Sequence, residues 1–189
     1  MNTEKLTKKS IQAIQQAQAI STEYMHNSID CEHLLMALIS QEEGLIPALL
    51  DRMQVDRASL SKAVSAALSR LPSVSGPGRE MDKLYVSQDL DRVLTQAEKT
   101  ADKMHDDFVS VEHLFLSLID SGNRAVKDIF RQYSIDKESF LKVLASARGN
   151  TRVATDDPES TYDALKKYGT DLVDAARRQK LDPVIGRDA

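Results

Sequence analysis

The sequence predicts an all-α protein built from a duplicated four-helix unit, and two observations support this prediction. Ala, Leu, Gln, Glu, Lys and Arg are abundant in the 189 residues, whereas Gly occurs seven times, Pro five times and Trp not at all. This composition favours helices over strands. In addition, "EHLLMALI" at residues 32–39 returns as "EHLFLSLI" at residues 112–119. A repeat at this distance indicates a structural duplication.

The duplication extends well beyond these motifs. Residues 6–69 align with residues 86–149 at a constant offset of eighty, without a gap and with eleven identical positions. Apolar character is repeated as well, for example in Ile29 and Val109, so the buried faces recur. We therefore predict eight helices with pseudo-twofold symmetry in a domain at residues 1–149, with repeat 1 at about 6–70, a spacer at 71–85 and repeat 2 at about 86–149.

The first two helices of each repeat are predicted from their capping residues and their apolar spacing. Thr7 and Ser87 can cap long first helices, because a hydroxyl oxygen accepts a hydrogen bond from an unpaired amide of the first turn. A polar turn follows, and Asp30 and Ser110 stand where the second helices need their caps.

The last two helices of each repeat follow the same logic. The third helix runs near residues 45–53, with Pro47 tolerated in its first turn, and near 124–133 in the second repeat. The fourth helix begins after Asp56 or Asp136, each a good cap preceded by an apolar residue.

The segments outside the repeats differ in composition. "LPSVSGPGREMDKLY" at residues 71–85 holds two prolines and two glycines and predicts an irregular tether. Residues 150–160 are polar and rich in turn formers, so they predict a flexible linker. A separate unit is predicted at residues 161–189, and it opens with the helical pattern "TYDALKKYGTDLVDAARRQKL" at residues 161–181, in which Gly169 is a possible break.

Charge and cysteine usage exclude several classes of protein. The net charge of −4 arises from interspersed acidic and basic residues and argues against a nucleic-acid partner. Cys31 is the single cysteine, and the chain has no signal peptide and no apolar run that could span a membrane. We expect a cytoplasmic protein without a membrane partner.

The repeated Glu-His pairs, Glu32-His33 and Glu112-His113, are the first candidates for chemistry. Neighbouring helical residues point about 100° apart, so each pair does not converge on one metal ion. We interpret both histidines as packed and both glutamates as favourable at a helix start. The alternative is that the two carboxylates are exposed and receive a cationic group, such as an arginine or a modified arginine, from a partner.

Other catalytic signals are missing from the sequence. Cys31 at a helix start could be an activated thiol, but its counterpart is Val111, which favours a small packed residue. No nucleophile elbow and no phosphate-binding loop occur. We expect no enzymatic activity, no metal and no cofactor in this chain.

Apolar residues near the starts of the two long helices are candidates for ligand binding. They could be partly exposed and line a groove that accepts unfolded segments, or they could seal the contact between the repeats. The sequence leaves both interpretations open. The residues are Leu6, Ile11, Leu84, Val86 and Leu90.

Together, the paired "EHLLMALI" and "EHLFLSLI" motifs and the tail "KKYGTDLVDAARRQKLDPVIGRD" resemble the N-terminal region of the Clp/Hsp100 family of AAA+ unfoldases. The resemblance covers nearly the whole chain, and "LSRLPSVSG" and "SQDLDRVL" are most similar to the disaggregase branch. "LDPVIGR" resembles the entry to the first ATPase domain, where Val184 and Ile185 would lie beside adenine. The chain then ends before the phosphate loop, so we expect a fragment.

The resemblance implies a substrate-recognition domain above a hexameric ring. It would pass unfolded or aggregated polypeptide to the AAA+ ring of the parent protein, which uses ATP and Mg and works with DnaK-system chaperones. Matching residues of the family imply substrate contacts at Thr7, Asp106 and Glu112. Without its ring, the fragment is expected to be monomeric.

The resemblance also implies a rival function. Domains of the ClpC type bind adaptor proteins or phosphoarginine through paired acidic pockets, for which Glu32 and Glu112 are the matching carboxylates. Cys31 and Val111 stand where that branch has threonine.

Overall fold

The computed structural model describes residues 2–76, 84–149 and 151–158. Within these residues the protein forms eight α-helices, which confirms the predicted fold class. The predicted helical pattern at residues 161–181, the expected start of an ATPase domain at residues 161–189 and the predicted adenine neighbours Val184 and Ile185 lie outside the described residues. The helices are α1 (Lys8–Glu23), α2 (Cys31–Ile39), α3 (Leu45–Arg52), α4 (Arg57–Arg70), α5 (Gln88–Lys103), α6 (Val111–Ser121), α7 (Arg124–Gln132) and α8 (Lys137–Arg148).

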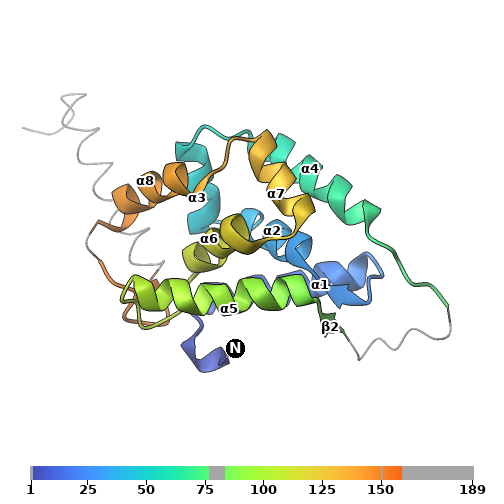
Figure 1. Cartoon of the computed structure of the whole chain (residues 1–189), viewed down its shortest axis with the longest axis horizontal. Helices are drawn as coiled ribbons and strands as arrows, with labels where there is room; N and C mark the ends of the chain where they lie inside the picture. The colour runs from blue at the N-terminus through green and yellow to red at the C-terminus, as the bar shows by residue number, and fades with distance from the viewer. Residues whose placement is uncertain (1, 77–83, 150, 159–189) are drawn as a thin grey trace, which may run out of the picture.

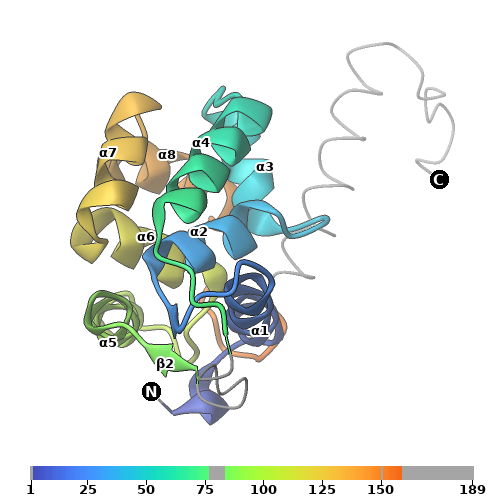
Figure 2. The same ribbon diagram turned by 90° about the vertical axis from the view of Figure 1, so that its right-hand side faces the viewer.

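The helices form three tiers (Figures 1 and 2). Helices α1 and α5 lie side by side at one face, α2 and α6 occupy the centre, and α3, α4, α7 and α8 cover the opposite face. The two repeats contact each other directly through α2 with α6, α4 with α7 and α3 with α8. The core is continuous across the repeats, and its fully buried side chains include Leu34 and Leu38 of α2 and Leu114 and Phe115 of α6.

The predicted caps of the long helices are present. The hydroxyl oxygen of Thr7 accepts a hydrogen bond from the Ser10 amide at 3.2 Å, and Ser87 accepts one from the Leu90 amide at 3.0 Å. Asp56 and Asp136 cap α4 and α8 in the same way. These contacts join residues three apart, so they follow directly from the local sequence.

Two short parallel pairings, which the sequence did not predict, connect the repeats. Strand β1 (Ser28–Ile29) pairs with β2 (Tyr85–Val86), so the segment before α5 lies beside the segment before α2. On the other side, Leu6, which follows a 3-10 helix, η1 (Thr3–Lys5), forms a parallel bridge with Val109. Each repeat therefore holds the entry to the first helix of the other repeat.

The start of the predicted linker differs from the expectation of a flexible segment. Residues 151–158, here called the clasp, lie against the helices and bury Val153 completely. The Val153 amide donates to Asp106 Oδ1 at 2.9 Å, and the Lys8 amide donates to the Asp156 carbonyl at 2.7 Å. A single apolar side chain with backbone hydrogen bonds is enough to hold this polar segment, which composition alone did not reveal.

Candidate functional site

The five apolar residues predicted to line a groove do not form one continuous groove. Leu6 and Leu90 are buried, with 4% and 3% of their surface exposed, and both belong to the continuous core. Ile11 and Leu84 are half-buried. Val86 is 49% exposed and is the single predicted groove residue with a largely accessible side chain.

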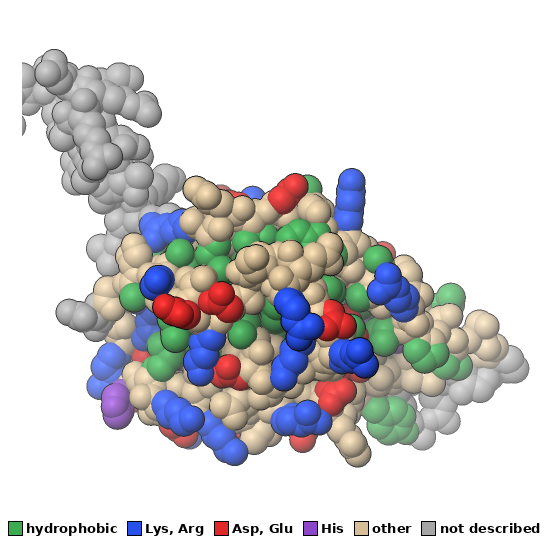
Figure 3. Space-filling model, turned by 45° about the horizontal axis from the view of Figure 1, so that its top comes forward, with side chains coloured by type: hydrophobic (Ala, Val, Ile, Leu, Met, Phe, Trp, Pro, Cys, Tyr) green, Lys and Arg blue, Asp and Glu red, His purple; other side chains and the backbone are tan. Residues whose placement is uncertain are grey.

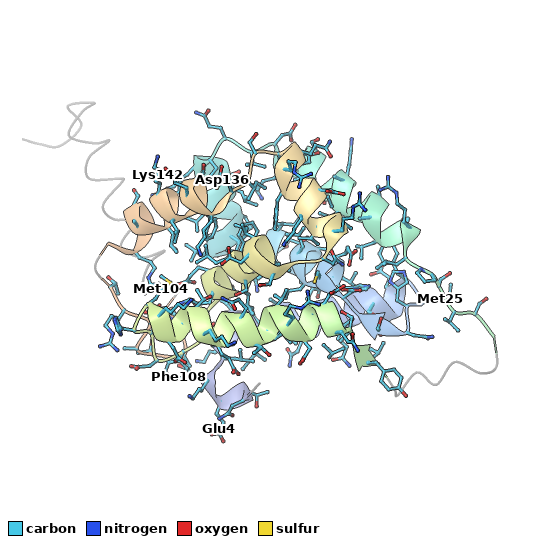
Figure 4. The ribbon with its side chains drawn as sticks, in the orientation of Figure 1. Glu4, Met25, Met104, Phe108, Asp136 and Lys142 are labelled. Carbon is cyan, nitrogen blue, oxygen red and sulfur yellow. The ribbon has the colours of Figure 1, made fainter. Side chains whose placement is uncertain are left out.

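An exposed apolar cluster nevertheless exists where the repeats meet. Met25, Tyr85 and Val86 are the exposed large apolar residues of the described part of the chain, with 44%, 65% and 49% of their surface accessible. We call them the junction patch. Tyr85 and Val86 form β2, which pairs with β1, and Met25 lies between α1 and β1. The β2 label of Figure 1 and the Met25 label of Figure 4, drawn in the same orientation, lie at the same end of the molecule. Exposed apolar atoms gather at that end in the space-filling view (Figure 3).

The two pseudo-equivalent edges differ in how they are covered. The offset of eighty places Val86 at the position of Leu6, yet Leu6 is buried and Val86 is exposed. Beside Leu6, the clasp bonds to the Lys8 amide through Asp156 and to the Asp107 amide through Val153. The domain thus covers the apolar edge at Leu6 with its own chain, whereas the equivalent edge at Val86 is exposed.

The alternative that both repeated glutamates are exposed is wrong. Glu32 and Glu112 are 2% and 0% exposed. Asn123 Nδ2 lies 3.0 Å from each carboxylate oxygen of Glu32, and Asn123 also caps α7. Burial raises the pKa of Glu32, and the hydrogen bond from Asn123 opposes that shift. Glu112 lies 3.6 Å from the Arg148 guanidinium, and neither of its oxygens has a hydrogen-bond partner.

Asp106 is the centre of a buried polar network in repeat 2. Arg148 donates to both of its oxygens at 2.6 and 3.0 Å, and His113 Nε2 lies 2.7 Å from Oδ2. Burial alone would raise the pKa of Asp106, but the hydrogen bonds from His113, Arg148 and the Val153 amide outweigh it. They hold the pKa well below its usual range.

The two histidines are packed, as the sequence predicted, and each completes a helix start. His33 Nδ1 accepts the Asp30 amide at 2.8 Å, and His113 Nδ1 accepts the Ser110 amide at 2.9 Å. Since Nδ1 accepts, the proton of a neutral ring lies on Nε2. His33 Nε2 then donates to His26 Nδ1 at 2.7 Å. In repeat 2, the equivalent nitrogen, His113 Nε2, donates to Asp106 Oδ2.

The repeats therefore use different partners for the same buried histidine: another histidine in repeat 1 and a carboxylate paired with an arginine in repeat 2. His26 and Leu68 of repeat 1 correspond to Asp106 and Arg148 of repeat 2. The role of Arg148 was missed at the sequence level. Two aligned positions that change together, one to an acid and the other to a base, are the signal that could have revealed the ion pair.

Thr7, Asp106 and Glu112, the implied substrate contacts, are all buried. Thr7 is fully buried at the cap of α1, and its amide donates to the Val109 carbonyl at 3.1 Å. Asp106 carries the clasp through the Val153 amide. Substrate contact by Thr7, Asp106 or Glu112 stays a prediction that requires movement of neighbouring groups.

Cys31 is a small packed residue, as predicted. It is fully buried, and desolvation raises its pKa to about 12. A thiol in that state is almost entirely protonated near neutral pH and is a poor nucleophile.

Among residues 2–76, 84–149 and 151–158, no group of three or more His, Cys, Asp or Glu side chains could hold a metal ion. No helix in these ranges has the length and apolar character needed to cross a bilayer.

A hollow of about 740 Å³ between α1 and the turn after α2 is lined by Lys9, Gln12, Gln41 and other mainly polar residues. It contains none of the predicted site residues.

We predict that Asn123→Ala lowers the free energy of unfolding by about 2 kcal/mol, because it removes a helix cap and leaves the buried Glu32 carboxylate without its amide donors. Chemical denaturation measures this change. The matched control is Glu43→Ala, since Glu43 is the aligned residue of repeat 1 and is exposed. An equal loss in both variants would contradict the role assigned to Asn123.

The geometry defines a double-repeat helical domain with an exposed apolar junction between its repeats. The family model described as the Clp repeat (R) N-terminal domain matches residues 5–133, and the chain belongs to this family. Over its whole length the chain is similar to ClpB chaperones. It is 45% identical to Chaperone protein ClpB of Nitratidesulfovibrio vulgaris and 41% identical to that of Clostridium tetani, and it spans 22% of the length of each.

Solved structures show the same fold at lower identity. The Hsp104 N-terminal domain from Candida albicans superposes with a TM-score of 0.69 at 23% identity, covering 80% of this chain and 96% of that one. A complex of the ClpV N-domain with a VipB peptide gives a TM-score of 0.59 at 19% identity, covering 82% of this chain and 91% of that one. The second neighbour is a domain of this fold in complex with a peptide.

Proposed function

We propose that this domain captures exposed apolar stretches of unfolded or aggregated polypeptide for a ClpB-type disaggregase. The observation that carries the proposal is the junction patch: Met25, Tyr85 and Val86 are exposed together, while the aligned edge at Leu6 is closed. Clustered exposed apolar side chains on a folded domain favour an interaction site. The ClpV N-domain, solved with a peptide, offers a precedent for peptide binding on this fold.

The small size of the patch predicts weak capture of many different segments. Burying a few hundred Å² of apolar surface contributes several kcal/mol at roughly 25 cal/mol/Å², and the entropy of association removes much of it. Rapid release suits a domain that hands its client onward. In the parent protein we propose transfer to the hexameric AAA+ ring, with ATP and Mg bound there and DnaK-system chaperones as partners.

The rival proposal of phosphoarginine or adaptor binding through Glu32 and Glu112 has less support. Asn123 already binds both oxygens of Glu32, and Glu112 is buried beside Arg148. A new cationic ligand at either carboxylate would have to displace groups of the domain itself. Titration with free phosphoarginine tests this rival, and saturable binding that Glu32→Ala and Glu112→Ala abolish would favour it.

We predict that Tyr85→Ser weakens binding of a permanently unfolded model protein about tenfold, because a large aromatic contact area is lost from the patch. Fluorescence anisotropy of the labelled client measures the affinity. Val86→Thr should weaken binding by a smaller factor, since it keeps the shape and replaces a methyl group by a hydroxyl.

Tyr85→Phe is the matched control, because it keeps the ring and should bind the client as the wild type does. Chemical-shift mapping with the same client should place the changes at Met25, Tyr85, Val86 and their neighbours. Unchanged affinity in Tyr85→Ser, or shifts confined to the opposite face, would refute capture at the junction patch.

A further inference from the structure

We infer that Met25 is a redox-sensitive site, at which oxidation to methionine sulfoxide weakens the binding of clients to the junction patch. The inference rests on the proposed function of that patch and adds its regulation. Met25 is 44% exposed, whereas Met36, Met53 and Met104 are half-buried and pack against the core. Among the methionines of the described residues, Met25 is therefore the one whose sulfur a dissolved oxidant reaches most readily.

The turn after α1 determines the exposure of Met25. The residue has a left-handed φ of 58°, its amide donates to the Thr22 carbonyl at 3.0 Å, and its carbonyl accepts the Val74 amide at 2.8 Å. These backbone hydrogen bonds hold the turn in place. His105, the aligned residue of repeat 2, has a φ of 59° and is exposed as well. The fold thus presents this position to solvent in both repeats.

Folding does not require an apolar side chain at this position. Met25 is the one apolar residue among the non-glycine residues that have a positive φ in the described part of the chain, and the others are Glu43, Gln54, His105 and Ser134. Since His105 occupies the equivalent turn, a polar group at position 25 leaves the turn intact. An apolar side chain at an exposed turn indicates a role in binding, and the flexible thioether of methionine suits varied partners.

Hydrogen peroxide and related hydroperoxides are the chemical class of oxidant. The thioether sulfur takes one oxygen atom from the peroxide: a sulfur–oxygen bond forms, the oxygen–oxygen bond breaks, sulfur loses two electrons and the second oxygen leaves as water. The sulfoxide is polar, so burying it against an apolar client costs free energy. Because the turn accepts polar side chains, oxidation lowers the affinity for clients without unfolding the domain. Methionine sulfoxide reductases regenerate the thioether and thereby restore binding.

The test treats the full chain with hydrogen peroxide, follows each methionine by peptide mass spectrometry and measures binding of the labelled unfolded client by fluorescence anisotropy. We expect Met25 to oxidise about fivefold faster than Met36, Met53 and Met104, in line with its exposure. The oxidised chain should bind the client about fivefold more weakly, and a methionine sulfoxide reductase should restore the affinity. Equal oxidation rates at these residues, or unchanged affinity after oxidation of Met25, would overturn the inference.

Two variants identify the responsible sulfur. Met25→Leu has no sulfur at this position, so its affinity after peroxide should equal the affinity of the same variant before treatment. Met53→Leu is the matched control, because Met53 lies at the end of α3 and packs against the core. This variant should lose affinity on oxidation as the wild type does. Continued loss of affinity in Met25→Leu would assign the effect to another methionine and refute the role of Met25.

Met25→Gln gives an answer without any oxidant. Glutamine is similar in length to methionine but polar, so it imitates the sulfoxide and should weaken client binding about fivefold. The midpoint of urea denaturation should equal that of the wild type. A clearly lower midpoint would show that position 25 requires an apolar side chain for folding, which contradicts the inference.

Tyr85→Ser separates the failure of this inference from the failure of the proposed function. If Tyr85→Ser weakens client binding and oxidation of Met25 does not, the junction patch still captures clients and the redox-sensitive site alone is refuted. If neither change affects binding, both proposals fail, because clients then bind elsewhere.

Discussion

Asp106→Ala is expected to lower the free energy of unfolding by about 3–5 kcal/mol. Removing one partner of a buried ion pair typically costs this much, because the other charge stays buried without compensation. Arg148 is 8% exposed and donates to both oxygens of Asp106, so the substitution leaves a buried guanidinium charge without its main partner. His113 also loses the acceptor of its Nε2 proton. Denaturation with urea, followed by circular dichroism, measures the change.

The duplicated repeat supplies a matched rescue for this variant. Repeat 1 has His26 and Leu68 at the aligned positions, and it packs without an ion pair. Asp106→His combined with Arg148→Leu therefore installs the residues that repeat 1 has at these two positions, while Glu112 loses Arg148 and has no equivalent of the Asn123 amide that holds Glu32. We expect the double variant to be at least 2 kcal/mol more stable than the sum of the single losses predicts, since contacting residues couple by such amounts. Strict additivity of the two substitutions would contradict the proposed equivalence of the sites.

Acid is expected to destabilise the domain through His33. Burial, with a smaller contribution from the nearby His26, lowers the pKa of His33 from 6.5 to about 4, because the folded state disfavours a charged ring there. The unfolded chain takes up this proton near pH 6.5, whereas the folded chain does so near pH 4. The stabilisation is therefore complete above pH 6.5 and is lost as the pH falls towards 4. The loss amounts to about 3 kcal/mol at roughly 1.4 kcal/mol per pKa unit.

His33→Gln isolates this contribution. Glutamine at the third helical position can still accept the Asp30 amide in the capping arrangement, but it does not titrate. The free energy of unfolding of the variant should fall less steeply between pH 6.5 and 4 than that of the wild type. Parallel curves for the two proteins, measured by urea denaturation at each pH, would show that His33 is not the responsible group.

The sequence by itself determined the eight helices, their order and the duplication. A cap such as Thr7 bonds to an amide three residues away, and helical apolar spacing is equally local, so both are legible in a single segment. The offset of eighty then related the two repeats before any contact between them was known. The packing of His33 and Cys31 also followed from local position and from comparison of the repeats.

The tertiary structure decided which of the repeated features are accessible. Glu32 was a candidate for an exposed carboxylate until Asn123, 91 residues away in the sequence, was found against it. Leu6 and Val86 are aligned and both apolar, yet the clasp lies beside Leu6, while Val86 stands at an exposed edge. The exposure of a side chain depends on which other segments of the chain pack against it. These segments are far apart in the sequence, and the local sequence of one does not indicate that the other lies beside it.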